Sequence, residues 1–506
     1  MGNNKFKEFL DKQKSIHDDK SAAEIQHKKG KLTARERLKY LLDADSFVEL
    51  DAFAEHHSAE LNKKKSGDGV VTGCGKINKK NVCVYAQDFS FVGGSMGEMH
   101  NKKIARVMEL ALKTGCPCIG LLDSGGARIQ EGISALDAGG KIFQLNTLSS
   151  GIIPQISAIM GPCAGIAVYS PALTDFIIMV KKTSYMFITG PDVIKSVTNE
   201  SIDFEGLGGA PAQTQKSGVA HFIADDEKEC LDMIKVLLTY LPQNNLESPP
   251  YHAADSSSRE TKKLQDIVPE DSKKTYDMKE VIAEIFDRKS FFEIQSNYAE
   301  NAVVGFARLN GNVVGIVANQ PKVLAGCLDI NSSDKIARFV RLCDCFNIPL
   351  INLVDVTGYL PGTNQEHNGI IRHGAKILYS YSESVVPKIS LVLRKAYGGA
   401  YIALVSKDMG YDKVLAWPTA EIAVMGAEQA VSIINRDEIN KNPKSKENLV
   451  NKYTEKYLNP YVAAKLGKAD MIIEPKETRI ALIKCLEMLI SKREKRPAKK
   501  HGNMPL

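Results

Sequence analysis

The chain contains a long internal repeat, which constrains its fold more than any other feature. The tripeptide Ile-Ala-Arg occurs at residues 104–106 and again at 336–338, and Asp123 recurs as Asp355 at the same offset, since 355 − 123 = 232. Farther on, residues 165–167 lie over residues 398–400 with one extra residue in between. A period far above the roughly 20 to 50 residues of solenoid repeats indicates duplicated domains. We therefore expect the function to depend on backbone geometry that the chain supplies twice.

The composition is that of an ordinary globular protein. A chain of 506 residues is long enough for two or more domains, and 43% of it is apolar and 25% charged. The formal net charge of +6 is small for this length, so we expect no nucleic-acid partner. None of the ten cysteines stands in a CxxC pattern, which favours reduced, buried thiols over a metal site. The charged first 20 residues are no secretory segment and predict a cytoplasmic protein.

One stretch, residues 142–174, has no charged side chain and is long enough to cross a membrane. Prolines at positions 154, 162 and 171 interrupt it. We therefore expect a helix, a strand and a buried turn here rather than a membrane span. An interaction with a partner embedded in the membrane stays an open alternative.

Both copies alternate short β-branched runs with amphipathic segments, as in VCVYAQD, KIARVMELALKTG and CIGLLD of the first copy. This alternation predicts an α/β fold of βαβ units, in which ligands bind at the carboxyl ends of the strands. Residues 251–275 are rich in serine, proline and charge, which is typical of a linker. We expect a first domain over residues 1–250, a linker over 251–275 and a second domain over 276–506.

Glycines cluster at the predicted junctions between strands and helices. Backbone amides at such junctions have no partner within the helix, and a pair of them suits an oxygen that gains negative charge. Any one of these glycines alone is more readily interpreted as a tight turn, but recurrence at matched register suggests two oxyanions in one reaction. No GxGxxG follows a strand, and Gln215 occupies the place where a Walker loop needs glycine, so neither a dinucleotide nor ATP is indicated. The glycines are Gly125, Gly126, Gly165, Gly358, Gly362, Gly398 and Gly399.

A competing hypothesis is a serine hydrolase. Ser95 stands in a GxSxG pattern at residues 93–97, with Asp123 and His221 in the chain order of an α/β-hydrolase triad. The second copy has Cys327 in place of the serine, and His221 lies in a strand-like context. Both observations weigh against this chemistry.

Longer motifs bring in a resemblance to a known family. The segments DSGGARIQEG, GPCAGIAVYSPALTDF, QEHNGIIRHGAKILY, RKAYGGAY and AWPTAEIAVMG resemble those of carboxyltransferase subunits of biotin-dependent acyl-CoA carboxylases, which include propionyl-CoA carboxylase β chains and methylmalonyl-CoA decarboxylase α chains. The resemblance covers nearly the whole chain. It implies two tandem crotonase-like domains of the ββα superhelix type, related by the internal duplication.

The resemblance also implies the reaction and its residues. A carboxyl group moves between N1-carboxybiotin and the α-carbon of a short-chain acyl-CoA, with propionyl-CoA and methylmalonyl-CoA as the expected pair, through enolate intermediates held in two backbone-amide oxyanion holes. The amides of Gly165 and Ile166 would form one hole, and those of Gly399 and Ala400 the other. The expected substrate-binding residues are Gly125, Gly126, Ala127, Arg128, Tyr397, Gly398 and Ile402.

Two positions depart from the family pattern. Ile166 stands where relatives usually have a second glycine, which keeps an amide donor but puts close approach of a ligand in doubt. Thr357 replaces a typical proline, which should change the stiffness of its loop more than its chemistry. Arg394 and Lys395 could hold an anionic group or be a solvated pair.

Cofactor and partners follow from the same resemblance. The chain has no biotinylation motif, so biotin is expected on a separate carrier protein or a biotinylated α subunit, and this subunit is expected to need no metal. The acyl-CoA is expected on the first domain and biotin on the second domain of another subunit, in a homo-oligomer that is usually a hexamer. The alternatives are an α subunit of a sodium-pumping methylmalonyl-CoA decarboxylase with a membrane-embedded partner, and, from other classes, the hydrolase or a CoA-binding hydratase or isomerase.

Overall fold

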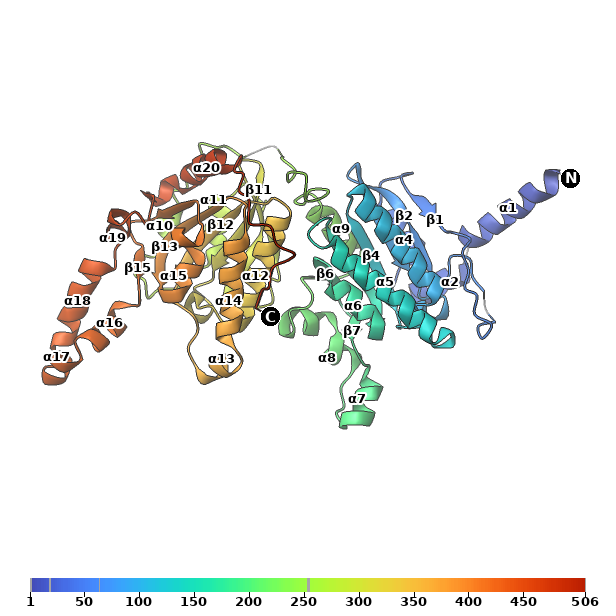
Figure 1. Cartoon of the computed structure of the whole chain (residues 1–506), viewed down its shortest axis with the longest axis horizontal. Coiled ribbons are helices and arrows are strands. Elements are labelled where there is room, and N and C mark those ends of the chain that lie inside the picture. Colours follow the sequence, from blue (N-terminus) through green and yellow to red (C-terminus); the bar gives the residue numbers. More distant parts are fainter. Residues whose placement is uncertain (1, 18–19, 63, 253–254, 506) are drawn as a thin grey trace. The chain divides into compact units, whose positions relative to one another are not determined.

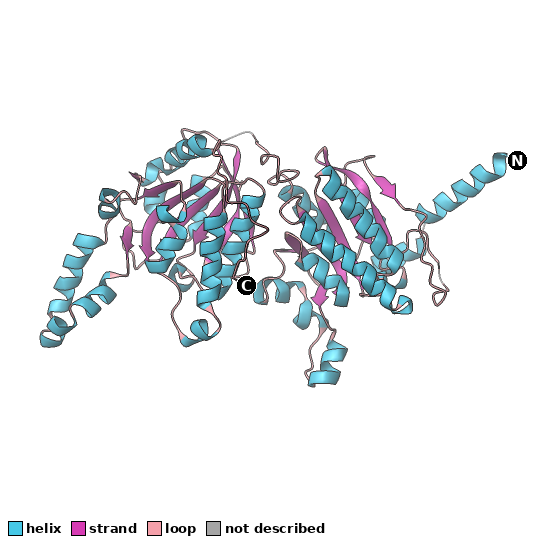
Figure 2. Cartoon of the chain, viewed as in Figure 1, coloured by secondary structure: helices cyan, strands magenta, loops and turns pink. Residues whose placement is uncertain are grey.

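The computed structural model describes residues 2–17, 20–62, 64–252 and 255–505. The chain divides into two compact units, Met1–Glu247 and Ser248–Leu506, and Figures 1 and 2 show a sheet flanked by helices in each. The α/β class and the internal duplication that the sequence predicts are confirmed.

The first unit is built on one sheet with the order β1-β2-β3-β4-β5-β6-β8, in which β7 pairs with the end of β5. Strands β1 to β3 are antiparallel, and the pairs from β3 onward are parallel. The strands are β1 (Val48–Leu50), β2 (Val70–Ile77), β3 (Lys80–Gln87), β4 (Cys118–Ser124), β5 (Gln155–Ala164), β6 (Phe176–Val180), β7 (Tyr185–Phe187) and β8 (Phe222–Ala224).

Helices cover this sheet because its central strands are apolar on both faces. Every residue of β4 is buried, as is typical of parallel strands enclosed by helices. The helices are α1 (Gly2–His17), α2 (Lys20–Lys28), α3 (Ala34–Leu41), α4 (Glu98–Thr114), α5 (Ile133–Ser149), α6 (Tyr169–Ala172), α7 (Pro191–Thr198), α8 (Phe204–Gly208) and α9 (Glu227–Leu237), with short turns η1 (Val92–Gly94), η2 (Ile129–Glu131), η3 (Gly165–Val168) and η4 (Ala212–Lys216).

The second unit repeats this sheet strand for strand, in the order β16-β14-β13-β12-β11-β10-β9, with β15 paired to the end of β13. Strands β10 (Ala302–Leu309), β11 (Asn312–Asn319), β12 (Leu350–Val356) and β13 (Lys388–Tyr397) have the lengths of β2 to β5 and lie at the offsets that the sequence repeat gives. The remaining strands are β9 (Phe292–Ile294), β14 (Lys413–Ala416), β15 (Glu421–Ala423) and β16 (Met471–Ile472).

The second unit's core lies between one face of its sheet and flanking helices, and it includes the buried Trp417. Its helices are α10 (Leu264–Ile267), α11 (Met278–Ile285), α12 (Ile330–Cys345), α13 (Thr363–His367), α14 (Ile370–Glu383), α15 (Gly398–Leu404), α16 (Ala427–Ile434), α17 (Arg436–Lys441), α18 (Ser445–Tyr457), α19 (Pro460–Lys465) and α20 (Thr478–Leu489), with turns η5 (Leu324–Gly326), η6 (Lys407–Met409) and η7 (Pro475–Glu477).

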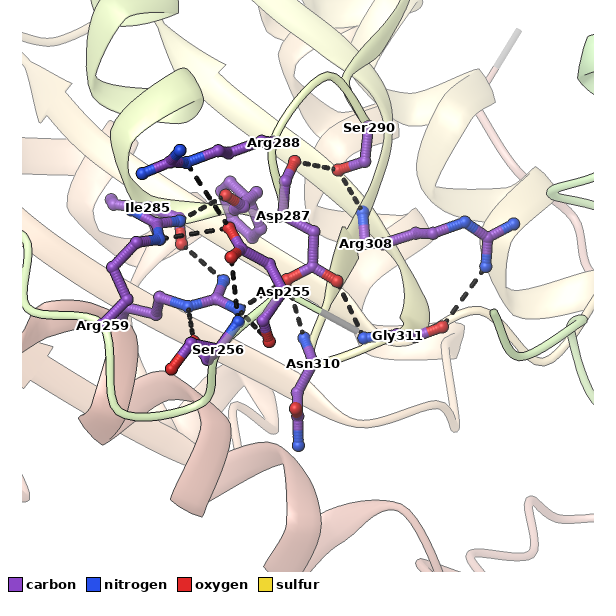
Figure 3. Close-up of polar contacts among 12 residues, drawn as sticks. Asp255, Ser256, Arg259, Ile285, Asp287, Arg288, Ser290, Arg308, Asn310 and Gly311 are labelled. Atoms are coloured by element: carbon purple, nitrogen blue, oxygen red, sulfur yellow. Dashed lines mark hydrogen bonds and ion pairs between the residues drawn. The ribbon is translucent and has the colours of Figure 1, made fainter. Parts of the chain in front are cut away.

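The segment expected as a linker, residues 251–275, packs on the second unit over much of its described length. Leu264 is fully buried in the core, and Thr261 donates a hydrogen bond to the carbonyl of Pro475 at 2.7 Å. Figure 3 shows the polar contacts around its start, where Asp255 lies near Asp287. The buried Arg479 pairs with Asp287 at 2.6 Å and also donates to the Asp255 carbonyl. This Ser- and Pro-rich segment is therefore held on the second unit by polar contacts.

The uncharged stretch at residues 142–174 folds as the end of α5, strand β5 and the short helix α6. Among the described residues, none of the helices combines the length and apolar character needed to span a bilayer.

Candidate active site

The two units share a special turn at the end of their longest strand. Strand β5 leads into η3 at Gly165, and β13 leads into α15 at Gly398. These glycines have φ of +58° and +56°, the left-handed region that glycine enters without steric cost. The first N–H groups of a helical turn have no acceptor within that turn. Each turn therefore brings backbone amides to the carboxyl end of a parallel strand.

The residues after the two glycines differ in burial. Ala167 and Ala400 are buried beneath their turns. Ile166 and Gly399, which precede these alanines, are less buried. The structure places all four predicted oxyanion-hole residues at these two turns, Gly165 and Ile166 in the first unit and Gly399 and Ala400 in the second. The second pair lies one residue farther along its turn than the first, because Gly398 is the counterpart of Gly165.

The loop at Gly125–Gly126 supports the first turn from the neighbouring strand. A Cβ atom on Gly126, which has φ of +107°, would lie 2.9 Å from the carbonyl oxygen of Ala164. The Gly125 amide donates to the carbonyl of Gly93, and the Gly126 amide donates to the Ser124 hydroxyl. These two amides are therefore bonded within the protein, so any contribution to substrate binding has to come from the shape of the loop.

Arg128, predicted to bind substrate, has its side chain inside the unit. Its guanidinium is fully buried and pairs with Asp68 at 2.7 Å and Glu131 at 2.8 Å, and it donates to the Ser95 carbonyl at 2.9 Å. Ala127, beside it, forms an isolated bridge with Met96. Arg128 thereby fastens the loop of residues 125–131 to the segment around Ser95.

Buried carboxylates end the strand beside each turn. In the first unit Asp123 accepts from Lys31 at 2.7 Å and from Arg37 at 3.1 Å. In the second, Asp355 accepts from Arg394 Nε at 2.9 Å and forms an ion pair with the same guanidinium at 2.8 Å. Burial lowers the pKa of the Lys31 ammonium, and Asp123 opposes that shift.

Comparison with known proteins identifies the family of this chain. The family model described as "Carboxyl transferase domain" matches residues 25–504. The methylmalonyl-CoA decarboxylase subunit alpha of Veillonella parvula is 56% identical over 96% of this chain and 95% of its own length. The biotin-dependent acetyl-/propionyl-coenzyme A carboxylase beta5 subunit of Mycobacterium tuberculosis is 52% identical over 98% of this chain and 94% of its own length. The chain belongs to the carboxyl transferase family.

Solved structures agree with this family. A transcarboxylase 12S crystal structure, a hexamer assembly with methylmalonyl-coenzyme A and methylmalonic acid bound, superposes with a TM-score of 0.97 at 50% identity, covering 100% of this chain and 99% of that one. The sequence-based assignment to this family is thus confirmed, and the protein is a carboxyltransferase.

In this carboxyltransferase, the replacement of the usual glycine by Ile166 is accommodated by a glycine on helix α5. The Ile166 side chain extends over helix α5, where its Cδ1 atom would lie only 2.6 Å from a Cβ atom on Gly139. Gly139 is buried in that helix. Because the glycine makes room, the isoleucine side chain packs on α5 and its amide stays in the turn.

The substrate-binding residues predicted in the second unit surround Gly398. Tyr397 is 8% exposed and donates its hydroxyl to Glu421, and burial beside that carboxylate raises the pKa of the phenol. Ile402, one turn along α15, is 47% exposed. An exposed apolar side chain next to the turn suits contact with an apolar group of a ligand.

The hydrolase arrangement is not assembled. Ser95 Oγ accepts from Arg128 Nε at 3.3 Å, Asp123 is held by Lys31 and Arg37, and His221 Nδ1 accepts from the Ile177 amide at 3.1 Å. The GxSxG pattern therefore builds a tight turn that Arg128 fixes.

Sequence reasoning missed the cations of the first site. Lys31 and Arg37 come from the N-terminal segment, and Arg37 bridges Asp123 and Glu227. The capping box of Thr33 and Glu36 fixes the start of α3 and so the direction of Arg37. Nothing in the spacing of the residues indicated this pairing. Arg394, by contrast, is buried rather than solvated.

Proposed function

We propose that this carboxyltransferase moves a carboxyl group between carboxybiotin on a separate carrier protein and the α-carbon of a short-chain acyl-CoA, with propionyl-CoA and methylmalonyl-CoA as the pair. The proposal is supported most directly by the two turns with φ of +58° and +56° at equivalent strand ends. Two turns of one geometry suit a reaction in which two oxygens gain negative charge.

In this proposal the chain acts through its backbone. The amides of Gly165 and Ile166 donate to the oxygen of one substrate, and those of Gly399 and Ala400 to the oxygen of the other. The dipoles of the turns that follow add positive potential at their N-terminal ends. The first domain, residues 1–250, takes the acyl-CoA and the second, residues 276–506, takes the biotin.

Biotin supplies the carboxyl group when the carrier delivers it. The second turn fits such a planar group because glycines at positions 398 and 399 leave its start without side-chain atoms, with Tyr397 and Ile402 beside it. A metal has no role in this scheme. We also propose a homo-oligomer, a hexamer as in the transcarboxylase 12S structure, acting in the cytoplasm.

A second candidate is the same half-reaction run as a decarboxylation, in a complex with a membrane-embedded sodium pump. The 56% identity to a methylmalonyl-CoA decarboxylase subunit alpha supports it. Co-purification of the chain with a multispan partner, rather than with a biotin carboxylase, would separate the two.

Isotope exchange between labelled methylmalonyl-CoA and free biotin tests the amide assignment, using Gly399→Pro, which removes the N–H at the second residue of α15. Proline is tolerated in the first turn of a helix, so the fold should survive. The matched control is Gly399→Ala, which keeps the N–H; its Cβ atom would lie 3.5 Å from the Tyr359 ring, an ordinary contact. We expect Gly399→Pro to lose about 100-fold or more in exchange and Gly399→Ala to keep most of it. Equal exchange in the two variants would refute the assignment.

A further inference from the structure

Three thiols from three neighbouring chain segments meet in the first unit. Cys74 lies on β2, Cys83 on β3, and Cys116 just before β4. The sulfur atoms of Cys74 and Cys83 are 2.8 Å apart, and that of Cys116 lies 3.7 Å from Cys83. This cluster is at the amino ends of the parallel strands, whereas the turns at Gly165 and Gly398 follow carboxyl ends.

Cys74 and Cys83 form a directly opposed pair in the antiparallel ladder of β2 and β3. The Cys83 amide donates to the carbonyl of Pro117, on the β4 side, so it points away from β2. The pair is therefore of the non-hydrogen-bonded kind, whose Cα atoms lie about 4.5 Å apart with the side chains close together. That separation falls within the range that a disulfide spans, about 4.4 to 6.8 Å.

The fold itself does not need three thiols here, because the second unit has only that of Cys343 beside Gly315. At the same ladder position of the second unit, Phe306 stands opposite Gly315, and the Phe306 ring packs on Phe339 at 5.5 Å. Ile348 takes the place of Cys116. One copy of the sheet thus fills this place with an aromatic ring, and the other with three thiols.

A cavity makes the thiols reachable. It has a volume of about 500 Å³ and is lined by the three cysteines together with polar residues that include Lys76, Thr114 and Asn244. Cys74 is only partly buried, whereas Cys83 and Cys116 are buried behind it. A small polar molecule therefore meets Cys74 first.

We propose that Cys74, Cys83 and Cys116 form a reversible oxidation site, in which Cys74 and Cys83 become a disulfide by exchange with a low-molecular-weight disulfide. The Cys74 thiolate attacks one sulfur of the small disulfide, forming a mixed disulfide and releasing one thiolate. Cys116 accepts the proton of Cys83, and the Cys83 thiolate then attacks the Cys74 sulfur and releases the second thiolate. The protein loses two electrons, which reduce the small disulfide to two thiols.

The local electrostatics support these roles. The Cys83 thiol lies beside both other sulfur atoms and can donate its one proton to either, which lowers the pKa of Cys74 and lowers that of Cys116 to about 7. The pKa of Cys83 itself is raised by the same neighbours. The two outer thiols, Cys74 and Cys116, are thus the ones that ionise readily, only Cys74 is partly exposed, and the central Cys83 is the proton donor.

The test uses the full chain in a glutathione buffer made increasingly oxidised, followed by alkylation of free thiols, trypsin digestion and mass spectrometry. Trypsin separates the three cysteines into peptides 66–76, 81–102 and 114–128. We expect peptides 66–76 and 81–102 to become cross-linked and to separate again with dithiothreitol. The peptide with Cys230, a buried thiol of the same unit, should stay reduced.

Variants decide the roles, with circular dichroism confirming that each is folded. Cys74→Ser should abolish the cross-link, Cys230→Ser should leave it unchanged, and Cys116→Ser should slow its formation about ten-fold. No cross-link in the folded wild type under oxidising conditions, or a link between peptides 81–102 and 114–128 instead, would overturn the proposal. An unchanged rate in Cys116→Ser would overturn the role of that thiol.

Discussion

Lys103 and Lys335 hold equivalent positions in the two units, and both ammonium groups are bonded to backbone carbonyls. Lys103 donates to the carbonyls of Gly67 and Val70 at 2.8 and 2.6 Å, and Lys335 donates to those of Gln295, Tyr298 and Ala302 at 2.9, 2.7 and 2.7 Å. Val70 and Ala302 begin equivalent strands, so each lysine fixes the loop that enters its sheet.

This relationship predicts an unusual pH dependence of stability. Burial lowers the pKa of Lys335 to about 7 from the usual 10.5. Between these values the unfolded chain binds a proton that the folded protein lacks, so this lysine makes the free energy of unfolding rise with pH. Lys335→Met removes the effect. The free energy of unfolding of the wild type should therefore rise by about 2 kcal/mol relative to that of the variant between pH 7 and pH 9.

Urea unfolding followed by the fluorescence of Trp417, the only tryptophan and part of the second unit's core, gives both free energies. Lys322→Met, at a half-exposed lysine of the same unit, is the control and should show no such difference. A constant difference in the free energy of unfolding between wild type and Lys335→Met from pH 7 to 9 would contradict a pKa of Lys335 that is lowered by burial.

Substitution by alanine should destabilise the protein at Gly398 but hardly at the neighbouring Gly399. Gly398 has φ of +56°, and a Cβ atom there would lie 3.1 Å from the carbonyl oxygen of Val424, whereas φ of Gly399 is not positive. We expect Gly398→Ala to lower the free energy of unfolding by about 1 to 2 kcal/mol and Gly399→Ala to change it by less than about 0.5 kcal/mol. Trp417 fluorescence during urea unfolding measures both, and equal losses would argue against the left-handed turn.

The sequence predicted the fold well because most of the repeated residues are ones that determine backbone geometry. The offset of 232 at Asp123 and Asp355 also relates β3 to β11 and β4 to β12, and the one extra residue farther on gives the offset of 233 between β5 and β13. The glycines marked the turns that end β5 and β13. The sequence predicted less well the contacts between residues that are distant in the chain. The amides of Gly125 and Gly126 bond to neighbouring backbone and a serine, and Arg128 turns inward to Asp68, because the loop folds back on a segment some 30 to 60 residues earlier. No local pattern encodes such contacts.

The buried carboxylate of Asp355 should matter for stability far more than an exposed one. Asp355→Asn would leave the buried guanidinium of Arg394 without its counter-charge, a loss of about 3 to 5 kcal/mol. Asp408→Asn removes a carboxylate that is 78% exposed and paired with Lys468, and should cost less than about 1 kcal/mol. Unfolding in urea at neutral pH compares the two. Similar small losses would mean that the carbonyls of Pro269, Asp271 and Lys274 suffice to hold Arg394.

The contact between Ile166 and Gly139 predicts a coupled pair. A methyl group on Gly139 would lie 2.6 Å from Ile166 Cδ1, so Gly139→Ala should displace the isoleucine and disturb the amide turn after β5. Ile166→Val removes that Cδ1 atom. We therefore expect Gly139→Ala to lower carboxyl transfer and the melting temperature in the wild-type background, and to do neither when Ile166→Val is present, with a coupling energy of about 1 kcal/mol.

Gly140, the next residue of α5, provides the control because a Cβ atom there would meet nothing within 4 Å. Gly140→Ala should stabilise the helix by up to about 1 kcal/mol and leave transfer unchanged, since alanine is the better helix former. The four single and double variants are compared by thermal unfolding and by isotope exchange. If the effects of Gly139→Ala and Ile166→Val simply add, the isoleucine side chain does not rest on α5, and its amide has lost the support on which the first oxyanion hole depends.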